Sequence, residues 1–256
     1  MAHMASASSP TVVMTSCGAV RGLSLPSNVT SYRSIPYAES PTGNLRWQPP
    51  MPCTTWPGTR DATAYRPACL QKAHYGTPSP SSEDCLNIHV STPPTATALK
   101  PIFVWLHGGG LLEGSAFAIQ SGFEAVLERL PTALDAVVVG VEYRLGVSGW
   151  LALDALADRD HRGEGKVGNY GLLDVLAALR WVQANAKAFG GDARRVTVCG
   201  QSSGGSLVLA LLASPASHGL LHRAISLSGS PRLNSTTRMR RPSMPLIHPC
   251  AAPPCL

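Results

Sequence analysis

The sequence has few charged residues and no long apolar run. Only 14% of its 256 residues are charged, whereas 44% are hydrophobic, which excludes a solvated disordered polymer and leaves enough apolar residues for a core. The longest apolar runs, 207–213 and 101–106, fall well short of the roughly 18 residues that a membrane span needs. We therefore expect no integral membrane protein. The start of the chain also lacks the apolar segment of a signal peptide.

Positive charge is concentrated near the end of the chain. The net charge is +6, but residues 1–231 contribute only +2 of it, and Arg232, Arg238, Arg240 and Arg241 contribute the rest. A nucleic-acid-binding protein spreads Lys and Arg over a folded face and interleaves aromatic residues. Because the basic tail contains no Phe, Tyr or Trp, we expect no nucleic-acid partner.

Short apolar runs alternate with helical patterns along the chain. Residues 172–189 form the clearest helix, because apolar residues recur every three or four positions and two glycines follow. Parallel strands with intervening helices predict an α/β fold. The expected strands cover 102–106, 136–141, 195–199 and 224–227, a hairpin covers 11–22, a second helix covers 206–213, and 45–67 is expected to be irregular.

The cysteine count restricts the disulfide pattern. Seven cysteines are present, so at least one thiol has no partner within the chain. Cys69 and Cys85 flank a stretch rich in Pro, Ser and Gly. The residues alone are equally compatible with a disulfide between them and with two reduced thiols.

The pentapeptide Gly200-Gln201-Ser202-Ser203-Gly204 fits Gly-x-Ser-x-Gly, the tight strand-to-helix turn that exposes a nucleophilic serine. Glycines are needed because side chains would collide with neighbouring backbone in so tight a turn. Chance alone predicts roughly 0.2 such matches in a chain of this composition, so the context decides. An expected buried strand precedes this turn and an expected apolar helix follows it, which makes Ser202 a candidate nucleophile.

A second glycine-rich motif, His107-Gly108-Gly109-Gly110, directly follows the expected strand 102–106. In hydrolases, a loop at this place lets backbone N–H groups approach a developing oxyanion. The alternatives are a flexible turn or a phosphate-binding loop. A phosphate-binding loop requires Gly-Lys-Ser or Gly-x-Gly-x-x-Gly at the start of a helix, and neither occurs here.

With these two motifs in this order, the chain resembles the type-B carboxylesterase family, the cholinesterase-like branch of the α/β-hydrolases. The resemblance covers residues 11–231 and implies an α/β-hydrolase fold with a mostly parallel central sheet. The further segments that carry it are Gly43-Asn44-Leu45-Arg46-Trp47, Ser82-Glu83-Asp84-Cys85-Leu86-Asn87, Val104-Trp105-Leu106, Glu142-Tyr143-Arg144-Leu145-Gly146, Gly168-Asn169-Tyr170-Gly171-Leu172-Leu173-Asp174, Phe189-Gly190-Gly191-Asp192 and Ala224-Ile225-Ser226-Leu227-Ser228-Gly229.

The resemblance assigns roles to individual residues. It implies that Ser202 is the nucleophile and that the N–H groups of Gly109, Gly110 and Ser203 form the oxyanion hole. His107 belongs to the loop motif and is not the base. No metal and no cofactor are implied, and the substrate is a small-molecule ester.

The resemblance also implies structural contacts. It pairs Cys69 with Cys85 in a disulfide beside the active site, which favours a secreted or ER-lumenal protein. It further implies two ion pairs, Arg46 with Glu83 and Arg144 with Asp174.

Several features depart from the family pattern. Gln201 stands where Glu is usual and Ser203 where Ala is usual, and the loop between Cys69 and Cys85 has no Trp, which disfavours a choline-ester specialist. The family places its triad in the order Ser, acid, His. After Ser202 this chain has no Asp or Glu, and its three later histidines are expected to be surface residues: His218, His222 and His248.

We therefore expect the N-terminal part of an esterase domain over 11–231, with C-terminal strands missing, an incomplete triad and little or no activity alone. Residues 1–10 are expected to be a disordered lead or a cloning remnant, and 232–256 a disordered or non-homologous tail. Two alternatives remain open: a non-catalytic cholinesterase-like interaction module, and a truncated gene product.

Overall fold

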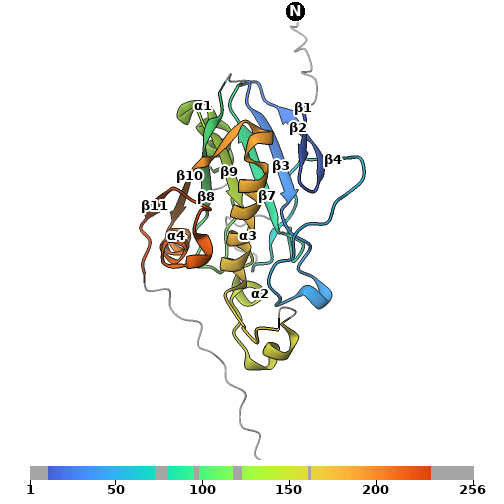
Figure 1. Cartoon of the computed structure of the whole chain (residues 1–256), viewed down its shortest axis with the longest axis vertical. Helices are drawn as coiled ribbons and strands as arrows, with labels where there is room; N and C mark the ends of the chain where they lie inside the picture. The colour runs from blue at the N-terminus through green and yellow to red at the C-terminus, as the bar shows by residue number, and fades with distance from the viewer. Residues whose placement is uncertain (1–10, 73–79, 95–97, 118–122, 161–162, 232–256) are drawn as a thin grey trace, which may run out of the picture.

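The computed structural model describes residues 11–72, 80–94, 98–117, 123–160 and 163–231. The expected lead 1–10 and tail 232–256, with His248, lie outside these ranges. Nine strands form one sheet in the order β1-β2-β3-β7-β9-β8-β10-β11, with β4 beside β2 (Figure 1). These strands are β1 (Thr11–Thr15), β2 (Gly18–Ser24), β3 (Thr30–Pro36), β4 (Thr59–Asp61), β7 (Asn87–Thr92), β8 (Lys100–Leu106), β9 (Val137–Val141), β10 (Gly191–Gln201) and β11 (Arg223–Leu227).

The sheet is parallel on one side and antiparallel on the other. Strands β9, β8, β10 and β11 run parallel, as the apolar runs predicted. From β1 through β2, β3 and β7 to β9, each neighbouring pair is antiparallel. The α/β prediction is confirmed, and the predicted mostly parallel character holds for the half of the sheet that follows β7.

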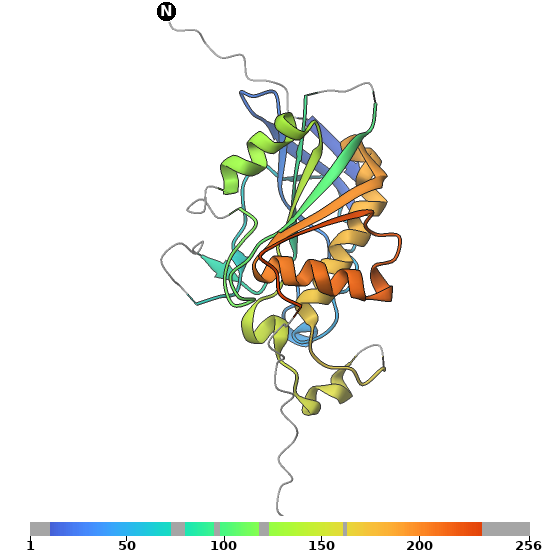
Figure 2. The ribbon, with the colours of Figure 1, turned by 90° about the vertical axis from the view of Figure 1, so that its left-hand side faces the viewer.

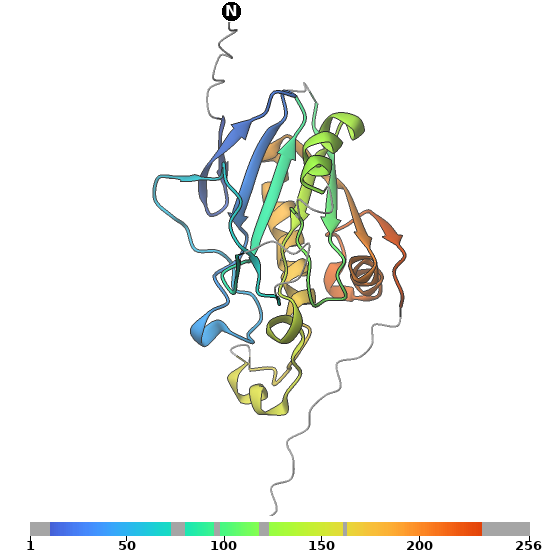
Figure 3. The same ribbon diagram turned by 180° about the vertical axis from the view of Figure 1, so that it is seen from behind.

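Helices cover both faces of the sheet. They are α1 (Phe123–Leu134), α2 (Gly146–Trp150), α3 (Tyr170–Asn185) and α4 (Ser203–Ala213). Helices α3 and α4 lie on one face and α1 lies on the other (Figures 1, 2 and 3). Right-handed crossovers explain this arrangement, because the chain moves one way along the sheet from β8 to β9 and the opposite way from β9 to β10 and β11.

This reversal places a topological switch point between β8 and β10. The connection after β8 passes to the face that α1 covers, whereas the connection after β10 passes to the face that α4 covers. In open α/β sheets, the crevice outside the carboxyl ends of two such strands is where ligands bind. Both glycine motifs begin at these two strand ends.

The predicted helix over 172–189 occurs with shifted bounds. Its regular part is α3, and residues 186–189 continue as the 3-10 turn η4 (Ala186–Phe189) before Gly190 turns the chain at φ 73°. Shorter elements are η1 (Gly43–Leu45), η3 (Asp154–Arg159), η5 (Pro215–Ser217), and the paired strands β5 (Ala68–Cys69) and β6 (Ser81–Ser82). No described helix is long and apolar enough to cross a membrane.

Some elements differ from prediction. The segment 45–67, expected to be irregular, contains the strand β4, which pairs with β2 over three residues. Strands β3 and β7 and helix α1 have mixed polar and apolar residues and were not predicted from periodicity. Among described residues β11 is the last strand of the parallel side, and Ile225 and Leu227 on it are 41% and 45% exposed.

Two disulfides are present among the described residues. Cys69, on β5, pairs with Cys85, which lies between β6 and β7, and both residues are buried. Cys17 pairs with Cys53 and so ties the β1–β2 turn to the loop that precedes β4. The sequence did not single out this second pair, because seven cysteines permit many pairings. Cys199 is a buried free thiol on β10.

We predict that non-reducing peptide mapping will recover both bridges. Replacing Cys69 and Cys85 together by Ser is expected to lower the free energy of unfolding by about 3 kcal/mol, because the bridge closes a short loop in the unfolded chain. Urea unfolding without reductant measures this loss. The matched control is Cys199→Ser, which breaks no bridge. Equal stability of the double variant and the unmodified protein would contradict the prediction.

Candidate active site

Ser202 occupies a strained turn between β10 and α4. Its backbone has φ 55° and ψ −122°, a region that costs a non-glycine residue about 1–3 kcal/mol. Its N–H donates to Leu227 O at 2.8 Å, which attaches the turn to β11. A Cβ on Gly204 would lie 2.3 Å from Leu106 O, so only glycine lets α4 pass so close to the end of β8. This strand, turn and helix have the form of a nucleophile elbow.

The loop after β8 lies directly against this turn. Strands β8 and β10 pair in parallel with Leu106 opposite Gly200, so both chains leave the sheet at the same level. A Cβ on Gly108 would lie 3.2 Å from the Cβ of Ser202. Gly109 and Gly110 follow with φ 108° and 65°. The structure thus brings together Ser202 and the glycines that sequence analysis grouped with it, across more than ninety residues of chain.

Three side chains hold the glycine loop in place. The Leu111 N–H donates to Ser203 Oγ at 3.2 Å, which joins the loop to the first turn of α4. The Tyr143 hydroxyl donates to His107 O at 2.6 Å. Gln71, two residues after Cys69, exchanges two hydrogen bonds with the backbone of Gly114, each 2.8 Å long. The roles of Gln71 and Tyr143 were not predicted from the sequence. Each of these side chains bonds to the backbone of a residue more than thirty positions away, and such a contact leaves no sequence motif.

His107 is buried within the glycine loop. Its ring is buried and stacks on Tyr143 at 4.3 Å between ring centroids. The ring Nδ1–H donates to Gly108 O at 2.8 Å, within the loop itself. Burial lowers the pKa of His107, so the ring is neutral near pH 7. These contacts give His107 a structural role in the loop.

Glu142 is the second buried ionisable group beside the loop. It follows β9 and is 1% exposed, and its Oε1 accepts hydrogen bonds from the Ser115 hydroxyl and the Ala116 N–H, both at 2.7 Å. Burial by itself raises the pKa of Glu142, but His89, His107 and the Ser115 hydroxyl together outweigh burial and hold this pKa below its usual range. Glu142 is therefore a buried carboxylate, which sequence analysis did not select.

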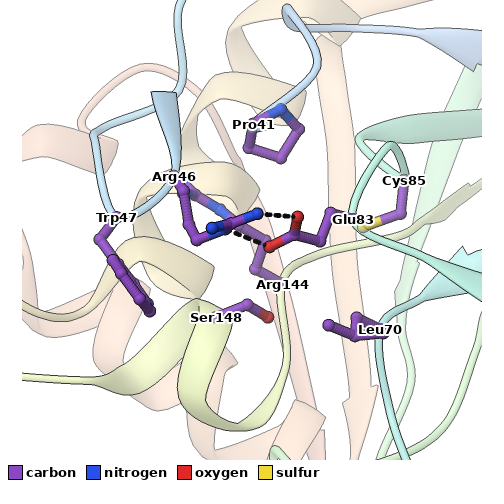
Figure 4. Close-up of a pocket in the computed structure, with 8 residues that line it drawn as sticks. All are labelled: Pro41, Arg46, Trp47, Leu70, Glu83, Cys85, Arg144 and Ser148. Carbon is purple, nitrogen blue, oxygen red and sulfur yellow. Dashed lines mark hydrogen bonds and ion pairs between the residues drawn. The ribbon is translucent and has the colours of Figure 1, made fainter. Parts of the chain in front are cut away.

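The two ion pairs are both present, in different surroundings. Arg46 binds Glu83 through two hydrogen bonds of 2.6 Å, and these hold the pKa of Glu83 below its usual range. Arg144 binds Asp174 through bonds of 2.8 and 2.7 Å, with both side chains buried. The Arg46–Glu83 pair lies over a small pocket that Arg144 also lines (Figure 4).

The histidines that follow Ser202 are placed away from it. The His222 N–H donates to Val196 O, and the Val196 N–H donates to His222 Nδ1. Val196 is six residues before Ser202 on β10, so at about 3.3 Å per residue the separation is about 20 Å. His218 follows η5, beyond the far end of α4. Neither reaches the Ser202 hydroxyl, and no cluster of three or more metal-ligating side chains occurs among the described residues.

Comparison with known proteins agrees with this geometry. The model of the carboxylesterase family matches residues 9–244. The chain belongs to the carboxylesterase family. It is 43% identical over 214 residues to Carboxylesterase 3B of Mus musculus, covering 78% of this chain and 35% of that protein. It is 38% identical over 238 residues to the medium-chain fatty acyl-CoA hydrolase precursor of Anas platyrhynchos, covering 85% and 40%.

Solved structures place this carboxylesterase chain in the same fold. A PNB esterase superposes with a TM-score of 0.76 at 39% identity, covering 86% of this chain and 44% of that one. The α/β-hydrolase fold is therefore confirmed. The chain spans between 35% and 44% of the length of these relatives.

We predict that breaking the buried Arg144–Asp174 pair destabilises this carboxylesterase chain more than breaking an exposed pair does. Arg144→Ala is expected to lower the free energy of unfolding by about 3–5 kcal/mol, because it leaves the Asp174 charge buried and unpaired. The control is Arg21→Ala, whose partner Asp61 is 54% exposed and whose loss is expected to be below about 1 kcal/mol. Urea unfolding measures both, and equal losses would contradict the prediction.

Proposed function

We propose that this chain carries the nucleophile and oxyanion hole of a serine esterase site, and that the whole protein hydrolyses small-molecule carboxylic esters through an acyl-enzyme on Ser202. The strongest support is the contact between the loop 107–110 and the Ser202 turn. It places the backbone N–H groups of a glycine loop beside a serine in a nucleophile elbow. The names of the relatives, which include a carboxylesterase and a PNB esterase, support the same class of reaction.

In the proposed reaction, Ser202 Oγ attacks the ester carbonyl carbon, its proton passes to a general base, and negative charge develops on the carbonyl oxygen. The N–H groups of Gly109, Gly110 and Ser203 donate hydrogen bonds to this oxyanion, and each such donor contributes about 3–4 kcal/mol to transition-state stabilisation. Ser203 is the first residue of α4, where backbone N–H groups have no acceptor within the helix and the helix dipole favours an anion. The alcohol then leaves, and water releases the carboxylic acid.

No residue of this chain is assigned as the base or as its acidic partner. After Ser202 the sequence contains no Asp or Glu, and the two described histidines after it lie elsewhere. We therefore propose that the 256-residue chain alone is weakly active or inactive. The loop glycines and Ser202 have no use in a purely adhesive domain, which favours an esterase over a non-catalytic module.

We also propose a secreted or ER-lumenal location. Two disulfides occur among the described residues, and structural disulfides persist in oxidising compartments. One relative carries the word precursor in its name.

We predict that p-nitrophenyl acetate acetylates Ser202 in preference to other hydroxyls, with steady-state turnover close to background. Loss of a triad member costs on the order of a millionfold in kcat, and the rate that remains over water comes from the oxyanion hole and substrate binding. Attachment and release of the acetyl group are therefore both slow, but the oxyanion hole still favours attachment at Ser202 over other hydroxyls. Peptide mass spectrometry locates and quantifies the acetyl group.

The variant Ser202→Ala is expected to remove this acetylation. The control Ser214→Ala, at the other end of α4, is expected to retain it. Acetylation spread evenly over surface serines and lysines would contradict the assignment of Ser202. Rapid turnover that Ser202→Ala abolishes would instead contradict the proposal that the triad is incomplete.

A further inference from the structure

We propose that Glu142, with His89 behind it, is a positioning residue that holds the glycine loop 107–117 in its oxyanion-binding conformation. This role rests on the proposed function of that loop. Glu142 follows β9 directly, and β9 pairs with β8 so that Val141 lies opposite Leu106, the residue before the loop. The carboxylate therefore starts one residue beyond the sheet, beside the loop.

Glu142 contacts the returning half of the loop. Its Oε1 accepts from the Ser115 hydroxyl and from the Ala116 N–H, both at 2.7 Å and both buried. The Ser115 hydroxyl oxygen also accepts from the Phe117 N–H at 3.1 Å. One carboxylate oxygen thus organises three consecutive residues of the loop.

The two halves of the loop are packed back to back. A Cβ on Gly114 would lie 2.5 Å from Gly108 O and 2.6 Å from His107 Nδ1. The N–H groups of Leu112 and Glu113 both donate to Gly109 O at 3.1 Å. A shift of the anchored residues 115 and 116 is therefore transmitted to the glycines that face Ser202.

His89 lies near the same carboxylate oxygen, Oε1. The Ser34 N–H donates to His89 Nδ1 at 3.0 Å, so this nitrogen carries no proton and the ring proton is on Nε2. His89 Nε2 lies 3.7 Å from Glu142 Oε1, with side chains 3% and 1% exposed. This distance exceeds a hydrogen bond, so the N–H acts on the carboxylate as a directed dipole.

The charge of Glu142 strengthens its hydrogen bonds to Ser115 and Ala116, so displacement of the loop is costly. None of the described Lys or Arg side chains forms an ion pair with Glu142, so its solvation comes from the Ser115 and Ala116 donors and the His89 dipole. A buried carboxylate that loses its donors is strongly destabilised. Displacement of the loop would remove two of them at once, and hydrogen bonds to a charged acceptor are about twice as strong as neutral ones.

Amide hydrogen exchange of the full chain, followed by mass spectrometry, tests this role without requiring activity. In Glu142→Ala, amides within 108–117 are expected to exchange about tenfold faster or more, because two buried bonds to a charge are lost. Glu142→Gln keeps an acceptor oxygen without the charge and is expected to show a smaller increase. Amides of α3 report whether the fold is intact and are expected to be unchanged.

Tyr37→Phe is the matched control. The Tyr37 hydroxyl donates to Glu142 O at 2.7 Å, so this variant removes a buried hydrogen bond to the same residue without touching its carboxylate. Loop exchange is expected to remain as in the unmodified protein. If Glu142→Ala does not fold, Ser115→Ala decides, since it removes one of the two donors and is expected to raise loop exchange severalfold.

Unchanged loop exchange in the Glu142→Ala and Ser115→Ala variants would overturn the proposal, as would an equal rise in Tyr37→Phe. The acetylation of Ser202 by p-nitrophenyl acetate is measured in the same variants. Slower acetylation in parallel with faster loop exchange supports both the positioning role and the esterase site. Absence of Ser202 acetylation even in the unmodified protein would instead contradict the proposed function, while loop exchange would still decide the role of Glu142.

Discussion

The parallel pairing of β8 with β10 is the constraint on which the candidate site depends. Leu106 lies opposite Gly200, so the glycine loop and the Ser202 turn leave the sheet together. Both strands are inside the sheet, and their apolar residues, such as Val104 and Val198, are fully buried. A slip of this register would cost core burial on both faces, so hydrophobic packing far from Ser202 sets the separation between the two loops.

The strained backbone of Ser202 is held by its surroundings. The turn is attached to β11 through the Ser202 N–H, and Gly204 packs against the carbonyl of Leu106. Each of these contacts belongs to an element that the core already holds. The strain of a serine at φ 55° therefore persists because strand pairing and helix packing outweigh it. The same arrangement places the first turn of α4 beside the loop after β8, where the Leu111 N–H donates to Ser203 Oγ.

Features that depend on a short segment of the chain were predicted from the sequence, whereas contacts between distant segments were not. Ser202, Gly109 and Gly110 were identified because each lies in a short motif beside an apolar strand. The Cys17–Cys53 bridge was not identified, since it depends on where two loops fold rather than on local pattern. Glu142 was not predicted for a similar reason. A carboxylate one residue after a strand has the sequence pattern of a surface residue, and only the tertiary structure shows that it is buried.

By itself, the sequence determined the α/β class, the family resemblance and the residues at the tip of the elbow, because periodicity and tight-turn chemistry are local properties of the chain. Only the tertiary structure decided that Gly108 meets Ser202, that His222 lies toward the other end of β10, and that Glu142 anchors the loop. These contacts join residues from 26 to 94 positions apart. Sheet register and packing set them, and no short segment of sequence encodes either.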